Sequence, residues 1–201
     1  QKAILAHPYA KRVLDKKALV EYFTFQNIFT DSTLLKDVKL LPPASVARIT
    51  RQISGQPRIN RYWDFRFREP DHYVDPREYR EELDRLMRQA VNRQLVADVE
   101  LGSYLSGGMD SGTLTALASR KLSYIKTFTC GFDLSSASGI EQAFDERIKA
   151  EAMSASFKTE HYEMVLKAGD MERCLPKLAW HIEEPRVGQS YPNYYAAKLA
   201  S

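Results

Sequence analysis

One run of the chain, residues 99–120, constrains the fold more than any other stretch of the sequence. It reads VELGSYLSGGMDSGTLTALASR. Residues 99–105 suit a buried strand, and Leu114, Leu117 and Ala118 follow at the spacing of one helix face. The run therefore predicts a strand, a glycine-containing turn and a helix in close succession.

The turn between this strand and this helix has the composition of an anion-binding loop. Gly107 and Gly108 can adopt backbone angles that are closed to other residues, so consecutive N–H groups of the loop can point into one concavity at the helix N-terminus. The hydroxyls of Ser106 and Ser111 add donors for phosphate oxygens. Asp110 offers a carboxylate that can hold Mg²⁺ against those phosphates or cap the helix. The loop is predicted to cradle phosphate; the alternative is a strand-to-helix turn with capping side chains.

Other phosphate and nucleophile motifs are absent from the sequence. A Walker loop needs G-x-x-x-x-G-K-[ST] and a dinucleotide fold needs G-x-G-x-x-G, and neither occurs in the 201 residues. Ser111 as a nucleophile would be expected within G-x-S-x-G, which is also missing, and no His lies near it in sequence. By contrast, S-G-G-x-D-S fixes most of its positions, so a chance match is roughly one in several thousand.

At these residues the sequence resembles the ATP pyrophosphatase superfamily, whose S-G-G-x-D-S loop binds the pyrophosphate part of ATP before an acyl group is adenylated. Residues 126–132, 144–163 and 181–201 look like the synthetase domain of glutamine-hydrolysing asparagine synthetases. Residues 15–49 and the RYWDF stretch at 61–65 are similar to the closing part of that family's glutaminase domain. The chain thus resembles a fragment that spans the end of one domain and the first part of the next.

The resemblance implies an α/β fold: a parallel sheet with flanking helices, of the adenine nucleotide α-hydrolase type, preceded by an α+β remnant of an N-terminal-nucleophile glutaminase domain. The predicted domains are residues 1–68, the C-terminal part of the glutaminase-like domain, and residues 69–201, the N-terminal part of the ATP pyrophosphatase domain. Residues 64–75 mix Pro, charge and aromatic side chains without a sustained period, which favours a boundary there. Strands that alternate with helices later in the chain favour a parallel sheet.

Local signals predict the remaining elements. Asp15 is placed to cap one helix, and Asp75 to cap a second with Pro76 in its first turn. The apolar face of a further helix is expected at Phe144, Ile148, Ala152 and Ala155. The other predicted elements are strands over 45–50 and 58–64 across a turn at 54–57, strands over 124–132 and 161–166, and helical patterns over 175–182 and at the end of the chain.

The resemblance also implies the residues of an ATP site. Those of the loop are Ser106, Gly107, Gly108, Asp110 and Ser111, with Asp110 as the Mg²⁺ ligand. The backbone at Tyr104 and at Cys130 would lie beside adenine; for Cys130 a small buried core residue is the other interpretation, and both can hold together. Because ligands of a parallel sheet sit beyond the carboxyl ends of its strands, the loop at Ser106 and the segment after Gly131 should face one crevice.

A charged turn near the end of the chain contains Glu183, Glu184 and Arg186. Such residues can neutralise phosphate or hold an amino-acid substrate, and the alternative is a charged helix exit broken by Pro. Some relatives place an Arg just before the Ser-x-Pro that matches residues 190–192, where this chain has Gly188. The roles of all three charged residues therefore stay open.

The activity implied by the resemblance is amide formation. ATP and Mg²⁺ would activate the side chain of aspartate as a β-aspartyl-adenylate, and glutamine-derived ammonia would then displace AMP and yield asparagine. The family's glutaminase nucleophile is an N-terminal Cys, which neither Cys130 nor Cys174 can match, so no catalytic residue is assigned and the fragment is expected to be inactive alone. The family's second acidic loop, S-G-x-G-x-D-E, is expected just after Ser201.

The composition of the chain bears on which classes of partner are expected. The formal net charge is only +3, and the Arg-rich region over 48–93 is interleaved with acidic residues, so no nucleic-acid partner is expected. Two thiols without C-x-x-C spacing, with no signal peptide and no long apolar span, favour the cytoplasm and no membrane partner. His161 and His181 lack metal spacing and should pack or hydrogen-bond. A homodimer is left open.

Three functions share these motifs. The first is an asparagine synthetase with aspartate, glutamine and ATP as substrates. The second is a related amidotransferase that acts on a peptide, antibiotic or polysaccharide precursor. The third is a nucleotide-binding module without catalysis, which would keep the phosphate loop but lack the acidic loop expected after Ser201.

Overall fold

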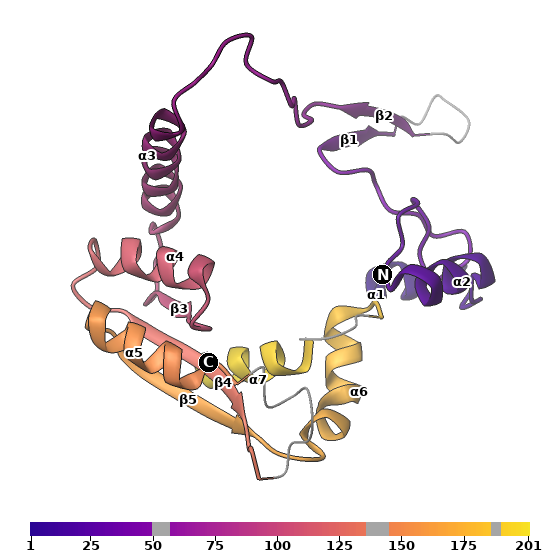
Figure 1. Cartoon of the computed structure of the whole chain (residues 1–201). Helices are drawn as coiled ribbons and strands as arrows, with labels where there is room; N and C mark the ends of the chain where they lie inside the picture. Colours follow the sequence, from indigo (N-terminus) through magenta and orange to yellow (C-terminus); the bar gives the residue numbers. More distant parts are fainter. Residues whose placement is uncertain (50–56, 136–144, 186–189) are drawn as a thin grey trace. The chain divides into compact units, whose positions relative to one another are not determined.

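The computed structural model describes residues 1–49, 57–135, 145–185 and 190–201. The chain forms two compact units (Figure 1). The first contains Gln1–Asp71 and the segment that begins at Ile182, and the second contains His72–His181 and the segment that ends at Ser201. The assignment of residues 1–68 and 69–201 to two family domains stays a prediction.

The first unit holds two helices and a two-stranded antiparallel sheet among its described residues. Its elements are α1 (Lys2–Leu5), α2 (Lys16–Phe25), β1 (Ser45–Arg48) and β2 (Arg58–Arg61). The carboxylate of Asp15 accepts hydrogen bonds from the N–H groups of Lys17 (2.9 Å) and Ala18 (3.2 Å), so the predicted cap of α2 is confirmed. The helix ends at Gln26, whose φ of 54° is left-handed.

The two strands of this unit are shorter than predicted. Ser45 pairs with Arg61 and Arg48 pairs with Arg58. One further hydrogen bond, from the N–H of Tyr62 to the carbonyl of Ala44 (2.8 Å), follows β2, and the chain then leaves the ladder. Positions 54–56 of the predicted turn lie outside the described residues.

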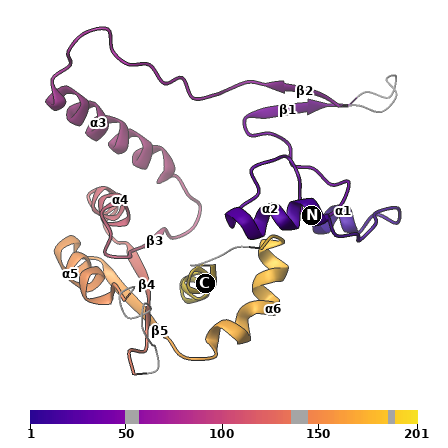
Figure 2. The same ribbon diagram turned by 45° about the vertical axis from the view of Figure 1, so that its right-hand side comes forward.

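The second unit is built around a three-stranded parallel sheet in the order β3-β4-β5, which confirms the predicted α/β sheet. Figures 1 and 2 show α4 and α5 on one side of the strands and α7 on the other. Its elements in chain order are α3 (Pro76–Gln94), β3 (Gly102–Tyr104), α4 (Met109–Ser119), β4 (Lys126–Phe132), α5 (Arg147–Phe157), β5 (Glu160–Leu166), α6 (Asp170–Ile182) and α7 (Ser190–Ala200).

Helix α3 begins as its sequence predicts. The carboxylate of Asp75 accepts the N–H of Arg77 at 2.9 Å, and Pro76 occupies the first turn. The helix packs against α4 through a buried apolar cluster of Val91, Leu117, Ala118 and Ile125, the residue before β4. This cluster anchors the strand-turn-helix unit from behind.

The predicted apolar face of α4 is confirmed at Leu117 and Ala118, which are buried, but not at Leu114, and the predicted face of α5 is wrong. Leu114 is 45% exposed, because α4 buries Thr115 instead, whose hydroxyl lies 2.8 Å from that of Ser103 in β3. On α5, Ile148 is 83% exposed, while Ala150 and Ser154 are buried. Phe144, which was expected on the same helix face, lies outside the described residues.

Hydroxyl groups explain the buried side of α5. Ser154 Oγ lies 2.8 Å from Thr159 Oγ1, which lies 3.0 Å from Thr127 Oγ1 in the middle of the unit. His161 Nδ1 lies 2.9 Å from the same Thr127 oxygen, and its Nε2 lies 3.2 Å from Glu163. The predicted hydrogen-bonding role of His161 is confirmed. In the part of the chain that the structure describes, no helix combines the length and apolar character needed to cross a membrane.

Candidate functional site

The loop between β3 and α4 has an unusual backbone at one of its two glycines. Gly107 has a φ of +71°, in the left-handed region that favours glycine. Gly108 has a φ of −80° and a ψ of 159°, an extended conformation that any residue adopts. The prediction of a special conformation is therefore right for Gly107 and wrong for Gly108, which serves as the N-cap residue of α4.

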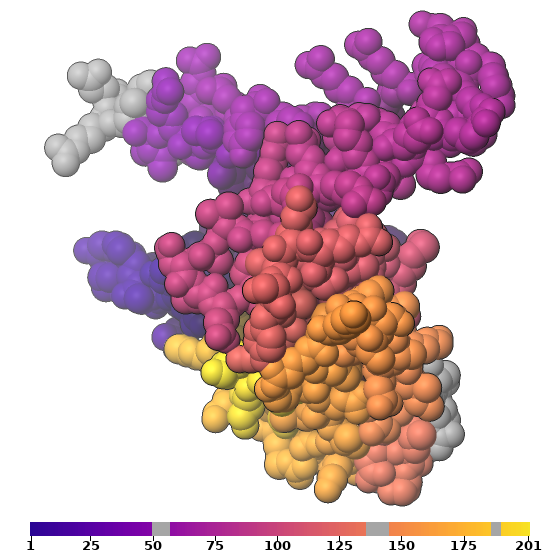
Figure 3. Space-filling view, turned by 90° about the vertical axis from the view of Figure 1, so that its left-hand side faces the viewer, coloured from indigo at the N-terminus to yellow at the C-terminus, as the bar shows by residue number. Residues whose placement is uncertain are grey.

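Gly107 also lies against the first turn of α5. A Cβ at this position would lie 2.6 Å from the Cβ of Lys149 and 3.2 Å from the carbonyl oxygen of Glu146. Space-filling atoms of α4 and α5, coral and orange in Figure 3, lie directly against each other. A Cβ at Gly108 would meet only Ser106 Oγ among the described atoms, at 3.3 Å. The loop thus rests on α5 through Gly107, and Gly108 is comparatively open.

The two serines of the motif meet in the loop. Ser106 Oγ lies 3.0 Å from Ser111 Oγ, and Ser111 Oγ donates a hydrogen bond to the carbonyl of Gly108 at 3.2 Å. The N–H of Ser106 donates to Ser111 Oγ, and the N–H of Gly108 donates to Ser106 Oγ. These two N–H groups point into the loop itself, which corrects the expectation of an unbroken row of outward donors. No described side chain caps α4, so the N–H groups of residues 109–111 are the donors that an anion would meet.

Asp110 lies in the first turn of α4 and is exposed. It does not cap the helix, because the cap residue is Gly108. Among the described residues, no three His, Cys, Asp or Glu side chains gather in a way that could hold a metal ion. Asp110 would therefore contribute a single carboxylate to any bound cation, and its role as a Mg²⁺ ligand stays a prediction.

The predicted adenine neighbours lie on adjacent strands. Tyr104 ends β3 and is 56% exposed, and its register partner is Phe128, two residues before Cys130. Cys130 is half-buried, and burial raises the pKa of its thiol to about 11. The hydroxyl of Thr129 donates to the carbonyl of Leu105, which ties this part of β4 to the start of the loop. Contact of either Tyr104 or Cys130 with adenine stays a prediction.

The predicted crevice at the carboxyl ends of the strands has a neighbour that the sequence analysis missed, Arg147. Its side chain lies across Gly131, where a Cβ would be 2.6 Å from Arg147 Cγ and closer still to Cδ and Nε. Its Nη2 donates to the carbonyl of Phe132 at 3.0 Å. The first turn of α5 therefore contacts both the loop 106–111 and the end of β4, the two segments that were predicted to face one crevice.

Arg147 is held by a carboxylate that was missed as well. Asp145 accepts hydrogen bonds from Arg147 Nε (2.9 Å) and Nη2 (2.7 Å). This hydrogen bonding lowers the pKa of the Asp145 carboxyl and raises the pKa of Arg147. In the sequence, Asp145 and Arg147 form an Asp-x-Arg pair after a strand that ends in Gly-Phe. The role of this pair could not be predicted from the sequence, because it depends on contacts with Gly131 and Phe132, more than ten residues away.

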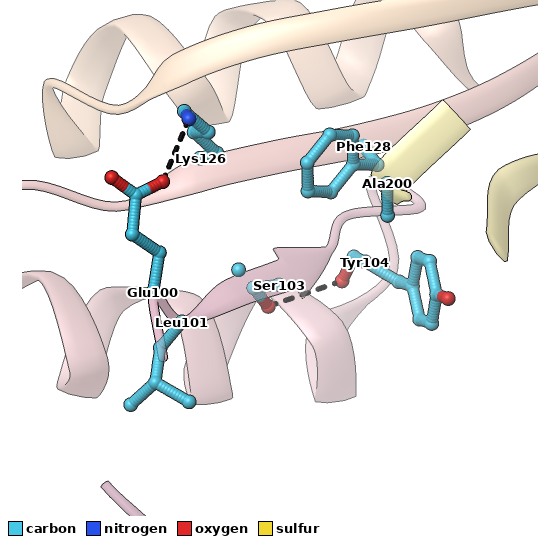
Figure 4. A pocket seen from close by; sticks show the side chains of 8 residues that line it. Glu100, Leu101, Ser103, Tyr104, Lys126, Phe128 and Ala200 are labelled. Carbon is cyan, nitrogen blue, oxygen red and sulfur yellow. Dashed lines mark hydrogen bonds and ion pairs between the residues drawn. The ribbon is translucent and has the colours of Figure 1, made fainter. Parts of the chain in front are cut away.

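A hollow of about 240 Å³ lies along β3 and the start of β4 (Figure 4). Lys126 and Glu100 form an ion pair of 2.8 Å at one end, and Phe128 and Tyr104 lie at the other. The described residues that line the hollow include none of the loop 106–111. The hollow is therefore distinct from the candidate phosphate site.

The charged turn after α6 is described in part. Glu183 has a φ of 64°, and its carboxylate accepts a hydrogen bond from the N–H of Lys2 at 2.6 Å. Glu184 Oε1 lies 3.5 Å from the side-chain amide of Gln1. Arg186 and Gly188 lie outside the described residues.

Comparison of the sequence with known protein families identifies the family of this chain. The family model described as asparagine synthase matches residues 82–201, which include the loop, α4, α5 and the whole parallel sheet. The chain therefore belongs to the asparagine synthase family.

Individual proteins with similar sequences are named as asparagine synthetases. The chain is 30% identical over 188 residues to asparagine synthetase [glutamine-hydrolyzing] 1 of Bacillus subtilis, a match that covers 93% of this chain and 28% of the relative. It is 33% identical over 189 residues to a putative asparagine synthetase [glutamine-hydrolyzing] of Mycobacterium bovis, with the same coverage. A putative asparagine synthetase [glutamine-hydrolyzing] 2 of Methanocaldococcus jannaschii is 31% identical over 144 residues, or 69% of this chain and 26% of that relative. The chain spans less than a third of the length of the curated relatives it matches.

Proposed function

We propose that this chain is part of a glutamine-hydrolysing asparagine synthetase and that its loop 106–111 binds the pyrophosphate part of ATP. The geometry of the loop supports the proposal: Gly107 is left-handed, and the hydroxyl oxygens of Ser106 and Ser111 lie 3.0 Å apart. The N-terminus of α4 is not capped by any described side chain, and the loop lies within the range that matches the family. The names of the relatives support the same activity.

The residues present fit a bound polyphosphate. The N–H groups of residues 109–111 point out of the first turn of α4, and the helix dipole favours negative charge there. The hydroxyls of Ser106 and Ser111 can redirect their mutual hydrogen bond to phosphate oxygens without moving the backbone. Preorganised donors of this kind can each contribute on the order of 3 kcal/mol to stabilisation of a departing pyrophosphate.

Asp110 is the carboxylate of this chain that would hold Mg²⁺, because it is exposed beside the loop and is not used as a helix cap. Bound Mg²⁺ would neutralise phosphate charge as pyrophosphate leaves. The remaining ligands would be phosphate oxygens and water, since Mg²⁺ usually retains several waters in nucleotide sites.

In the proposed reaction, the side-chain carboxylate of aspartate attacks the α-phosphorus of ATP, the bond to pyrophosphate breaks, and a β-aspartyl-adenylate forms. Ammonia from glutamine then displaces AMP and gives asparagine. In this proposal the second unit is the first part of an adenine nucleotide α-hydrolase-like domain, and the first unit is a remnant of an N-terminal-nucleophile glutaminase domain. Tyr104 and Cys130 would flank the adenine.

The Asp110→Asn substitution tests the metal-binding role in the full-length protein. We expect it to abolish ATP–pyrophosphate exchange with little change in the thermal midpoint, because this carboxylate is exposed and does not cap its helix. Asp84→Asn is the matched control, since Asp84 is an exposed carboxylate on α3 that pairs with the neighbouring Arg88. Wild-type exchange in the Asp110 variant would refute the assignment.

A further inference from the structure

The first turn of α5 packs closely against two glycines that are far apart in the sequence, Gly107 in the loop and Gly131 near the end of β4. On one side it supports Gly107, whose missing side chain leaves room for Glu146, Lys149 and Ala150. On the other side it carries Arg147, which lies across the end of β4. The loop and the strand end are therefore linked through one helical turn.

The link to β4 is made by a constrained side chain. Arg147 makes a bidentate pair with Asp145 and a hydrogen bond of 3.0 Å to the carbonyl of Phe132. The side chains of Arg147 and Asp145 are 24% and 11% exposed. Three hydrogen bonds and limited exposure leave the guanidinium little freedom, and a fork-to-fork pair fixes both distance and orientation.

Gly131 makes this arrangement sterically feasible. Any Cβ at Gly131 would overlap the Cγ, Cδ and Nε atoms of Arg147, which belong to the middle of the side chain rather than to its mobile end. The arginine therefore packs directly on the strand backbone. A methyl group at Gly131 would displace Arg147 without changing any charge.

We infer that Arg147, held by Asp145 across Gly131, is a positioning residue that fixes the first turn of α5 and through it the phosphate loop at Gly107. Its Nε and Nη2 are already engaged by Asp145 and Phe132, so it acts through α5 and not by touching the nucleotide. Loss of Arg147 should disorder the loop 106–111 and so weaken ATP binding. The effect on ATP binding rests on the proposed function, whereas the effect on the order of the loop does not.

The test uses three variants of the full-length protein: Arg147→Met, Gly131→Ala and the double variant. Val91→Ala, in the buried cluster shared by α3 and α4, is the control for general loss of stability. Hydrogen exchange of residues 106–111 without ligand reports the order of the loop. Binding of ATP with Mg²⁺ reports the function, and the thermal midpoint reports stability.

We expect both single variants to speed exchange at residues 106–111 and to weaken ATP binding by roughly ten- to a hundredfold, because a displaced loop misaligns hydrogen bonds to charged phosphate oxygens and one such bond contributes about that much to affinity. The double variant should be no worse than Arg147→Met, since a methionine that is not tied to Asp145 can turn away from the methyl group added by Gly131→Ala. Val91→Ala should lower the thermal midpoint without selective exchange at the loop.

The outcomes separate the inference from the proposed function. Loop exchange that matches wild type in Arg147→Met, or that changes equally in Val91→Ala, would overturn the inference. Fully additive effects of the two substitutions would overturn it too. If wild-type protein fails to bind ATP, the proposed function fails, and the exchange measurement alone then supports or overturns the positioning role.

Discussion

At the scale of single residues, the two adjacent glycines of the loop behave differently. Gly107→Ala places a Cβ in a left-handed conformation and against the Cβ of Lys149. We expect a loss of ~1–3 kcal/mol in the free energy of unfolding from backbone strain alone, together with loss of ATP binding. Urea denaturation and ATP titration of the same variant measure both effects.

Gly108→Ala is the matched comparison. Its backbone is extended, so an alanine there carries no left-handed strain, but alanine is a poorer N-cap residue than glycine and its Cβ would lie 3.3 Å from Ser106 Oγ. The free energy of unfolding should therefore fall by only ~0.5–1 kcal/mol. ATP binding should still weaken, because the methyl group stands at the N-terminus of α4 where phosphate is proposed to approach. A Gly108 variant that is destabilised yet binds ATP normally would contradict the phosphate cradle.

Cys130 gives a pH-dependent prediction. Its thiol pKa is raised by burial to about 11, so the folded state keeps a proton that the unfolded chain releases near its ordinary pKa of about 8.5. Unfolding therefore becomes easier as pH rises from about 9 to 11, and the stability attributable to this thiol is fully present below that window. Alkylation of Cys130 should be slow at about pH 8 and accelerate with pH.

The control for this prediction is Cys130→Ser, in which the alkaline loss of stability should be smaller. Cys174→Ala serves as the background, because burial also raises the pKa of Cys174. Fast alkylation of Cys130 in the folded protein at about pH 8 would show that the thiol is more exposed or more acidic than its environment indicates.

Single residues also show what the sequence can predict. Asp15 and Asp75 were identified as helix caps because the cap signal is local, and the structure confirms both. The conformation of Gly108 was predicted wrongly, because the sequence does not show which of two adjacent glycines adopts the left-handed conformation. Arg147 was missed because its role depends on Gly131, which lies on another element and is recognisable as a partner only after folding.

At the scale of elements, a chain of hydroxyl groups fixes α5 to the sheet. Thr127 is fully buried, and its Oγ1 contacts Thr159 and His161. We expect Thr127→Val to lower the free energy of unfolding by ~1–3 kcal/mol, because buried partners lose a hydrogen bond while the shape is retained. Chemical denaturation measures the change.

Thr113→Val is the control for this substitution, since Thr113 is exposed on α4. It should change stability by less than ~0.5 kcal/mol. Equal effects of the two substitutions would show that the hydroxyl network does not stabilise the packing of α5.

The elements themselves were largely predictable, but their buried sides were predictable only in part. Strand and helix positions followed from composition and capping, and the sheet is parallel as expected. Apolar spacing correctly identified Leu117 and Ala118 as buried on α4, but it missed the buried Thr115 on α4 and Ser154 on α5. Periodicity counts apolar residues and cannot detect hydroxyl groups that pair across a sheet.

At the scale of the whole molecule, the family match extends well beyond the loop 106–111, over residues 82–201. The family match covers the complete parallel sheet of the second unit. The motif alone identified the candidate phosphate loop, because S-G-G-x-D-S is a local pattern that sets local geometry. The amide acceptor was not predictable in the same way, since side chains that recognise an acceptor come from several elements and carry no fixed spacing.

Binding of ATP by the loop 106–111 for activation of aspartate is tested by exchange of labelled pyrophosphate into ATP. The full-length protein is assayed with Mg²⁺, in the presence and absence of aspartate. We expect exchange that requires aspartate, is not supported by glutamate, and is lost in Asp110→Asn but retained in Asp84→Asn. Absence of exchange with aspartate, or exchange that is equally fast without it, would show that the loop does not serve the activation of aspartate.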